Sequence, residues 1–467
     1  MSNLLNQSSY VEGIYAPVSD ELTASDLRVV GEIPADLHGV FAQNSPNAAL
    51  PPIGFPHWFD GDGMVHALHL DGGEATYRNR YVQTAKLAAD RAAGRQLRPG
   101  ILMPFDPADA TPEPDTANTD LVWHGGDLLA LHYLGGEPHR LDPVTLETRG
   151  IQTWGGALDC GVAAHPKVCP QTGEMMFIDF GFREAPWLRY GVVDAAGKLV
   201  HRLDVDIPQP TFMHDIAITT HHTVFLDLPM TWDQGALAAG KRRIRFNKET
   251  PSRFGVVARR GTQVQWFETP ACYAYHTINA WEEQDAAGNT VVHMTGCRID
   301  DPIPSTPHAT EPTVPRLTFL RLAPFLWKWT FNLGTGAVTS EQLDDVATEF
   351  PRMNDRHLGT RTRYSWNPRI GPAPTLVFDG LIKYDDQGPT IAHGYGDAVG
   401  GEAVFAPRPG ATAEDDGWML VYVHDGDGSE LRILDAATMD LAARIELPQR
   451  IPFGFHAAWV PGQELRA

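Results

Sequence analysis

The sequence predicts an all-β fold, and in particular a seven-bladed β-propeller. Short segments rich in β-branched and aromatic residues recur along the 467 residues, each bounded by Gly, Asp or Pro. Long amphipathic helical runs are scarce, and a strand–turn–strand theme repeats without a fixed period. Repeated meanders over about 470 residues, in blades of about 40–60 residues, predict about seven blades.

The strand segments follow one another from the first hundred residues to the last fifty. They include a segment with period-two alternation, "FMHDIAIT" at 212–219. The others are 64–70, 127–134, 223–228, 253–259, 263–268, 289–294, 418–425 and 431–436. Only residues 81–96 and 233–243 have the composition of helices.

Four segments predict hairpins by their turn chemistry. They are "RLDPVTLETRG", "GVVDAAGKLVHRLDV", "FNLGTGAVTS" and "RILDAATMDLAARIEL", each with Asp or Asn and then Gly or Thr in a short turn between two strands. A sandwich or jelly roll would need fewer residues. No segment has the composition of a linker, so we expect one domain over residues 1–467.

The charge excludes one class of partner. The net charge is −21, from 37 Lys and Arg against 58 Asp and Glu, so the chain repels a phosphate backbone and we expect no nucleic acid. An anionic membrane is disfavoured too, although a small apolar patch that contacts lipid weakly is compatible with this charge. Neither the charge nor the rest of the sequence indicates an oligomeric state.

Targeting signals are not evident. The start lacks a basic region followed by an apolar run, and no stretch approaches about 18 consecutive apolar residues. The four cysteines form neither a CxxC pair nor a disulfide-scaffold spacing. We therefore expect a cytoplasmic protein.

One histidine stands at the start of a strand, on its core side. In "FMHDIAIT", His214 shares a face with Ile216 and Ile218. A single histidine of this kind is usually a core residue that bonds a backbone carbonyl. His165, His276 and His456 have the same setting elsewhere in the chain.

In a propeller the innermost strands start near the axis, so these four imidazoles can meet there. Four neutral imidazoles suit iron, copper or zinc. With 19 histidines in the chain, spacing alone leaves other quartets open.

Blocks along nearly the whole chain resemble one family. They include "GVFAQNSPN", "HWFDGDGMVHAL", "AHPKVCPQTGEM", "FMHDIAIT", "YHTINAWEE", "GGEAVF" and "LPQRIPFGFHAAWV". The chain resembles the carotenoid cleavage oxygenases, non-haem iron enzymes that also include stilbene-cleaving relatives. The resemblance implies a seven-bladed propeller with loops and a few short helices over the metal end. It also implies one Fe(II) held by His165, His214, His276 and His456, with O2 as co-substrate.

The resemblance further implies glutamates that hold the free ring nitrogens of the histidines. They match Glu147 in "TLETRG", Glu349 in "TEFPR" and Glu402 in "GGEAVF". A carboxylate in that place fixes the tautomer and turns the other nitrogen to the metal. Phe59 in "HWFDG" matches a position that lines the substrate site, Tyr275 is a further candidate for such a position, and a core role is equally open for each.

The implied reaction is oxidative scission of a C=C bond of an apolar conjugated alkene into two carbonyl products. Stilbene- and isoeugenol-type relatives hold a phenol with a lysine before "LDPxTLET" and a tyrosine in the preceding loop. Here the lysine is missing and Ile101 or a neighbour takes the tyrosine's place, although Tyr133 or His132 offers another phenol partner.

The blocks "RIPFGFHAAW" and "EFPRMNDRHLGTRTRY" look more like the carotenoid-cleaving branch, so the sequence favours a carotenoid or apocarotenoid. A stilbene or phenylpropenoid remains the alternative. An isomerase on the same scaffold, or a propeller that only binds ligands, is the third reading.

Overall fold

The computed structural model describes residues 9–108, 114–302, 322–373, 375–426 and 428–466. The chain divides into two compact units. Unit 1 comprises Met1–Ala164, Asp233–Arg243 and Tyr395–Ala467, and unit 2 comprises His165–Trp232 and Ile244–Gly394. The single domain expected over residues 1–467 stays a prediction.

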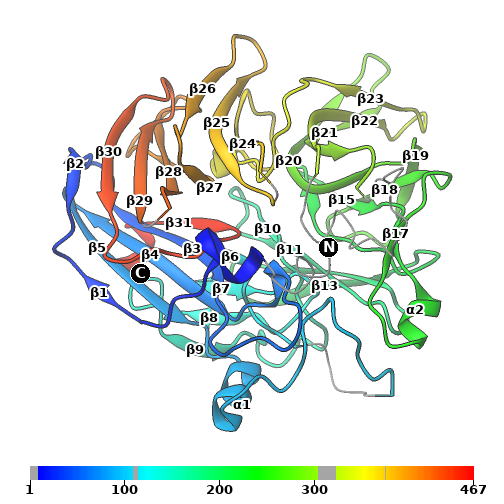
Figure 1. The fold of residues 1–467 in the computed structure, drawn as a ribbon. Helices are drawn as coiled ribbons and strands as arrows, with labels where there is room; N and C mark the ends of the chain where they lie inside the picture. Colours follow the sequence, from blue (N-terminus) through cyan, green and yellow to red (C-terminus); the bar gives the residue numbers. More distant parts are fainter. Residues whose placement is uncertain (1–8, 109–113, 303–321, 374, 427, 467) are drawn as a thin grey trace. The chain divides into compact units, whose positions relative to one another are not determined.

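Unit 1 contains three antiparallel sheets in its described residues (Figure 1). The first has the order β1-β5-β4-β3-β31, with β1 Thr23–Ala24, β3 Gly39–Pro46, β4 Gly63–Asp71, β5 Glu74–Tyr81 and β31 Ala457–Pro461. The second runs through β6 Asp120–His124, β7 Asp127–Leu131, β8 His139–Leu141 and β9 Thr148–Ile151. The third joins β2 Val29–Gly31 to β30 Leu441–Glu446, β29 Ser429–Asp435, β28 Gly417–His424 and β27 Val399–Pro407.

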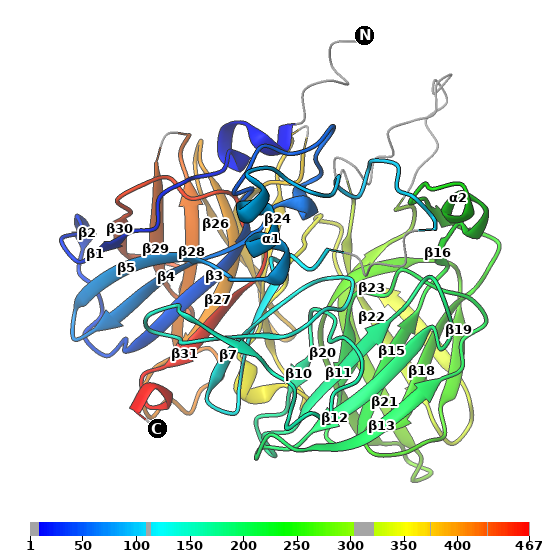
Figure 2. The ribbon, with the colours of Figure 1, turned by 90° about the horizontal axis from the view of Figure 1, so that it is seen from below.

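Unit 2 contains four further strand groups and a short hairpin in its described residues. Figure 2 shows the first group, β10 Lys167–Val168, β11 Met175–Phe180, β12 Leu188–Val193 and β13 Leu199–Val205. The second is β14 Ile216–Ile218, β15 His222–Asp227, β18 Ser252–Ala258 and β19 Gln265–Thr269. The third is β20 Tyr273–Gln284, β21 Thr290–Ile299, β22 Phe325–Asn332 and β23 Val338–Gln342. The fourth is β24 Tyr364–Ile370, β25 Phe378–Asp385 and β26 Ile391–Gly394, and the hairpin is β16 Met230–Trp232 with β17 Ile244–Phe246.

These antiparallel sheets, together with the few short helices, fit the predicted all-β fold class. Every predicted strand segment contains or overlaps an observed strand, and all four predicted hairpins form. The β4–β5 turn illustrates how glycine residues indicate a tight turn between two strands. Its two central residues, Gly72 and Gly73, have φ of 58° and 86°, which glycine adopts without strain.

Helices are few and short. α1 (Ala85–Ala93) and α2 (Gln234–Ala238) occupy the two segments predicted to be helical. Thr84 caps α1 by accepting from the Leu87 amide, and Gly94 ends it with φ of 65°. Single 3-10 turns form η1 Ser9–Val11, η2 Gly13–Tyr15, η3 Trp58–Asp60, η4 Asp355–His357 and η5 Glu464–Arg466. Among the described residues, no helix has both the length and the apolar character needed to cross a bilayer.

The cores lie between neighbouring sheets within each unit. In unit 1, Phe41 of β3 packs edge-to-face on Tyr422 of β28, with 4.9 Å between the ring centroids. In unit 2, Ile278 of β20, Leu326 of β22 and Ile382 of β25 share one cluster. Because side chains on both faces of the inner strands are buried, the strands are fixed in position, and with them the residues at their ends.

Candidate metal centre

Three of the predicted histidines converge in unit 2. The Nε2 atom of His214 lies 3.1 Å from that of His165 and 3.2 Å from that of His276. All three side chains are buried. They come from three different sheets, because His165 precedes β10, His214 precedes β14 and His276 lies within β20.

The backbone turns two of these rings out of regular strand geometry. His165 has φ of 67°, in the left-handed region that a non-glycine residue seldom adopts. His276 lies in a bulge, because the pairing of β20 with β21 shifts between Ala274 and Thr277. Such a bulge re-aims a side chain. Gly296 on β21 makes room for it, since a Cβ there would lie 2.9 Å from the His276 carbonyl oxygen.

This arrangement fits a divalent metal ion. Metal–nitrogen bonds of about 2.0–2.1 Å place neighbouring ligand nitrogens about 3 Å apart, which is the observed spacing. A donor set of buried imidazoles suits iron, copper or zinc. Without a cation, nitrogen lone pairs would face one another in a buried space.

Carboxylates hold the far nitrogen of two predicted ligands. In unit 2, His276 Nδ1 lies 2.5 Å from Glu349 Oε2, which also accepts from the Phe350 amide at 2.5 Å. In unit 1, His456 Nδ1 lies 3.0 Å from Glu402 Oε1, and the Ala457 amide donates to Glu402 Oε2 at 2.7 Å. Both carboxylates and both imidazoles are buried. Each ring is thus turned with Nε2 away from its carboxylate.

Glu147 occupies a different place from the one predicted. It is exposed at the turn between β8 and β9, where its amide bonds Thr145 Oγ1 and its carbonyl accepts from the Asp142 amide. A solvated glutamate at a hairpin turn does not fit the role of a buried carboxylate behind a histidine. His456 directly precedes β31, at the start of a strand as predicted.

The two aromatic candidates lie beside predicted ligands. Tyr275 is buried in unit 2 with its ring edge-to-face on His214, at 5.2 Å between centroids, and burial raises the pKa of its hydroxyl. In unit 1, Phe59 contacts Tyr133 at 4.8 Å and Phe455 at 5.2 Å. Phe455 directly precedes His456, so Phe59 connects that histidine's segment to a nearby pocket.

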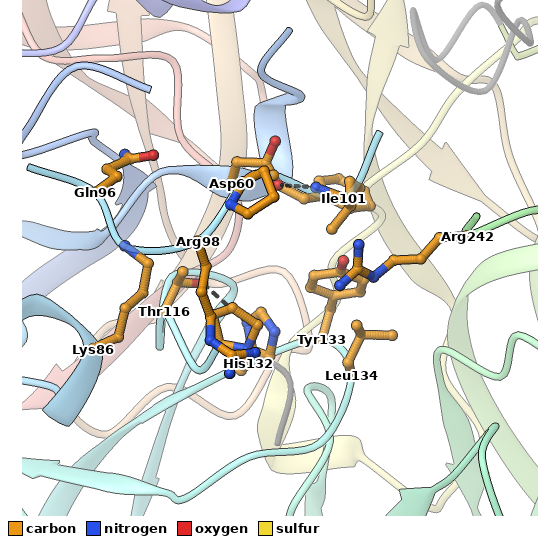
Figure 3. A pocket seen from close by; sticks show the side chains of 14 residues that line it. Asp60, Lys86, Gln96, Arg98, Ile101, Thr116, His132, Tyr133, Leu134 and Arg242 are labelled. Atoms are coloured by element: carbon orange, nitrogen blue, oxygen red, sulfur yellow. Dashed lines mark hydrogen bonds between the residues drawn. The ribbon is translucent and has the colours of Figure 1, made fainter. Parts of the chain in front are cut away.

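That pocket lies wholly in unit 1 (Figure 3). Apolar walls come from Phe59, Ile101, Tyr133 and Leu134. Polar and charged side chains also line it, namely Asp60, Lys86, Gln96, Arg98, Thr116, His132 and Arg242. Figure 3 shows Tyr133, Leu134 and Arg242 close together, and His132 Nδ1 lies 3.0 Å from Thr116 Oγ1.

Asp60 and Arg242 are pocket residues that sequence reasoning missed. Burial raises the pKa of Asp60 to about 6, although its oxygens accept from the amides of His57 and Ile101 at 2.7 and 2.8 Å. Asp60 directly follows Phe59, and that adjacency was an available signal. Arg242 carried no signal, because it lies more than a hundred residues from the rest of the lining.

Comparison with known proteins assigns the family. The family model described as retinal pigment epithelial membrane protein matches residues 15–461. The carotenoid 9,10(9',10')-cleavage dioxygenase 1 of Phaseolus vulgaris is 33% identical over 98% of this chain and 90% of that protein. The isoeugenol monooxygenase of Pseudomonas nitroreducens is 32% identical over 99% and 100%.

Solved structures agree with this. The crystal structure of Pseudomonas brassicacearum lignostilbene dioxygenase matches with a TM-score of 0.86 and 30% identity, over 98% of this chain and 99% of that one. The predicted resemblance, all-β fold class and enzyme class are thereby confirmed. The chain belongs to the carotenoid cleavage oxygenase family, a family of β-propeller oxygenases.

Proposed function

We propose that this protein is an Fe(II)-dependent dioxygenase that cleaves a C=C bond of a carotenoid or apocarotenoid into two carbonyl products. The observation that carries the proposal is the convergence of three buried Nε2 atoms at 3.1 and 3.2 Å. That donor set has no cysteine and no carboxylate, so it suits an intermediate divalent ion and leaves positions for O2.

His456 is the fourth ligand in this proposal. Its support is its burial and its carboxylate partner, because Glu402 holds His456 in unit 1 in the way that Glu349 holds His276 in unit 2. Bound Fe(II) supplies the O2-dependent oxidation of the alkene. The chain's residues hold the rings in one tautomer, keep water out and orient the substrate.

The pocket of unit 1 receives one end of the substrate. Phe59, Ile101 and Leu134 supply apolar walls for a conjugated chain or ring. His132 and Arg242 supply polar contacts for an oxygen at that end. Leu134 and Ile101 lie in the part of the sequence where phenol-binding relatives carry lysine and tyrosine, and this favours a carotenoid or apocarotenoid.

Cleavage of a stilbene or phenylpropenoid is the second candidate. The similarity to a lignostilbene dioxygenase structure and to an isoeugenol monooxygenase supports it. Tyr133 and His132 line the same pocket and are able to bind a phenol hydroxyl.

The metal assignment is tested by iron stoichiometry. Purified protein reconstituted with Fe(II) should hold one iron per chain, and the His276→Ala and His456→Ala variants should each lose it. His221→Ala, at an exposed histidine bonded to Glu282, is the matched control and should keep the iron. Iron retained at the wild-type level by His276→Ala would contradict the proposal.

The substrate assignment is tested by turnover in air. The panel holds a C40 carotenoid, an apocarotenal, a hydroxystilbene and a 4-hydroxyphenylpropenoid, with products identified by mass spectrometry. Aldehydes from the polyenes alone support the proposal. Aldehydes from the phenolics alone favour the second candidate, and iron-loaded protein without any cleavage product points to an isomerase or a binding propeller.

We also propose that unit 1 contacts a membrane weakly through an apolar rim, defined as Ile53, Leu97 and Leu102. These are exposed, at 38%, 45% and 37% of their surfaces. Their segments pack together, because the Phe55 amide lies 3.4 Å from Met103 Sδ and Gln96 donates to the Leu50 carbonyl at 3.2 Å. Gln96 and residues 98–101 line the pocket, so the rim adjoins the place that would receive an apolar substrate.

A further inference from the structure

Asp215 is a buried carboxylate that contacts Lys167 and Thr277, residues next to or near two histidines of the centre. It directly follows His214 and is 1% exposed. Its Oδ1 lies 2.7 Å from Lys167 Nζ and accepts from the Ile216 amide at 2.7 Å. Its Oδ2 accepts from the backbone amide and the hydroxyl of Thr277, each at 2.8 Å.

These contacts join the three segments that carry the histidines of unit 2. Lys167 is two residues beyond His165, and Thr277 directly follows His276. The three segments belong to three different sheets, so no single β-ladder sets their spacing. The buried Asp215 carboxylate therefore connects three histidine-bearing segments that strand pairing does not join.

The backbone at Thr277 is suited to this contact. Thr277 lies at the bulge of β20, where the ladder to β21 shifts on both sides of it. A bulge leaves a residue outside the regular ladder. The Thr277 amide donates to Asp215 instead, and this fixes the residue next to His276 relative to the residue next to His214.

We propose that Asp215 is a positioning residue of the metal centre, which sets the spacing of His165, His214 and His276 through Lys167 and Thr277. The inference rests on the proposed function, because it concerns the affinity and geometry of a bound metal ion. Outer contacts of this kind typically change metal affinity by about 10–100-fold when they are lost.

A purely structural role is the alternative, and unit 2 offers a matched control. Asp227 is buried and pairs with Arg253 on the neighbouring strand β18, with Oδ2 2.8 Å from Arg253 Nε. Neither residue adjoins a histidine of the centre. Asp215→Asn and Asp227→Asn each break one buried ion pair, so both should lower thermal stability.

The experiment uses full-length protein freed of metal with a chelator and titrated with Co(II), followed by visible absorption. Asp215→Asn should bind Co(II) about 10–100-fold more weakly than the wild type and show an altered ligand-field band. Asp227→Asn should bind within twofold of the wild type. Wild-type affinity and spectrum in Asp215→Asn would overturn the inference, and so would an equal loss in Asp227→Asn.

If Asp215→Asn does not fold, two less disruptive substitutions at Thr277 test the same inference. Thr277→Val keeps the shape of the side chain and removes the contacts of the hydroxyl with Asp215 Oδ2 and the Ile216 carbonyl, whereas Thr277→Ser keeps both. Co(II) affinity should fall in Thr277→Val and stay at the wild-type level in Thr277→Ser. Equal affinities in the two variants would overturn the inference.

The two proposals fail in different ways in this experiment. Wild-type protein that binds no Co(II) in a His276-dependent manner overturns the proposed metal centre, and the inference falls with it. Wild-type binding together with an unaffected Asp215→Asn variant overturns only the role of Asp215.

Discussion

At the scale of single residues, the carboxylate behind a histidine decides which nitrogen faces the metal. Glu349 Oε2 lies 2.5 Å from His276 Nδ1 in a buried setting. Glu349→Gln removes the charge and should lower metal affinity by about 10–100-fold. Competition with a fluorescent metal chelator measures this loss.

Glu147→Gln is the control for that substitution. Because Glu147 is exposed at the β8–β9 turn, its variant should bind metal as the wild type does. A loss in Glu147→Gln equal to that in Glu349→Gln would restore the sequence-based role of Glu147, and wild-type affinity in Glu349→Gln would contradict the role argued here for Glu349.

The sequence identified the histidines more readily than the glutamates for a physical reason. Histidine on the core face of a strand is unusual, so its position is itself a signal. Glutamate is common at turns, and "TLETRG" forms an ordinary exposed hairpin whose Glu147 points to solvent. Glu349 and Glu402 differ from it in burial, which depends on tertiary packing and cannot be read from neighbouring residues.

Tyr275 provides a second prediction at this scale. Its ring packs on that of His214, and within the described part of the chain its buried hydroxyl has no hydrogen-bond partner. A buried hydroxyl without a partner lowers stability unless substrate or solvent supplies the missing hydrogen bond. Tyr275→Phe should therefore keep or raise the melting temperature while lowering kcat/KM by about 5- to 10-fold.

Tyr273→Phe gives the opposite pattern and serves as the comparison. The Tyr273 hydroxyl donates to the Phe212 carbonyl at 2.8 Å, so its removal should lower the free energy of unfolding by about 1–3 kcal/mol. Thermal unfolding and steady-state kinetics distinguish the two variants. A Tyr275→Phe variant that is destabilised and fully active would contradict the placement of this hydroxyl at the substrate.

At the scale of elements, local chemistry predicts which segments form strands but not which strands meet. The predicted hairpins form because their turns bring adjacent strands together. By contrast, β2 near the start pairs with β30, and β31 near the end pairs with β3, across more than four hundred residues in each case. Such pairings depend on packing of the whole unit, and the bulge at His276 likewise has no local signature.

Asp60 makes a pH-dependent connection between elements of unit 1. It lies at the end of η3 and accepts from the Ile101 amide of the pocket segment at 2.8 Å. Burial raises its pKa from 3.8 to about 6, so the folded protein binds this proton more tightly than the unfolded chain. The contribution of Asp60 to stability is therefore largest below about pH 4 and declines as the pH rises to about 6.

Asp60→Asn lacks this titration. The free energy of unfolding of the wild type, measured relative to the variant by urea denaturation, should fall between about pH 4 and pH 6 and then level off. A difference that stays constant over this range would show that the Asp60 carboxyl keeps its ordinary pKa.

At the scale of the whole molecule, net charge decides which lipid surface the protein tolerates. A chain of net charge −21 is repelled by anionic lipid, so the proposed contact through the apolar rim of Ile53, Leu97 and Leu102 should favour neutral lipid. Burial of three partly exposed aliphatic side chains gives weak, reversible attachment at about 25 cal/mol per Å². Such attachment suits an enzyme whose substrate partitions into the bilayer.

Vesicle co-sedimentation provides the test of this membrane contact. The wild type should bind phosphatidylcholine vesicles weakly and phosphatidylglycerol vesicles less well at low salt, with the difference shrinking as salt screens the charge. The triple variant Ile53→Ser, Leu97→Ser and Leu102→Ser should lose binding to both. Val29, Ile151 and Leu441 are similarly exposed residues of unit 1 outside the rim, and serine at these three positions should leave binding unchanged. Equal binding by the two triple variants would show that general surface hydrophobicity, rather than the rim beside the pocket, attaches the protein to lipid.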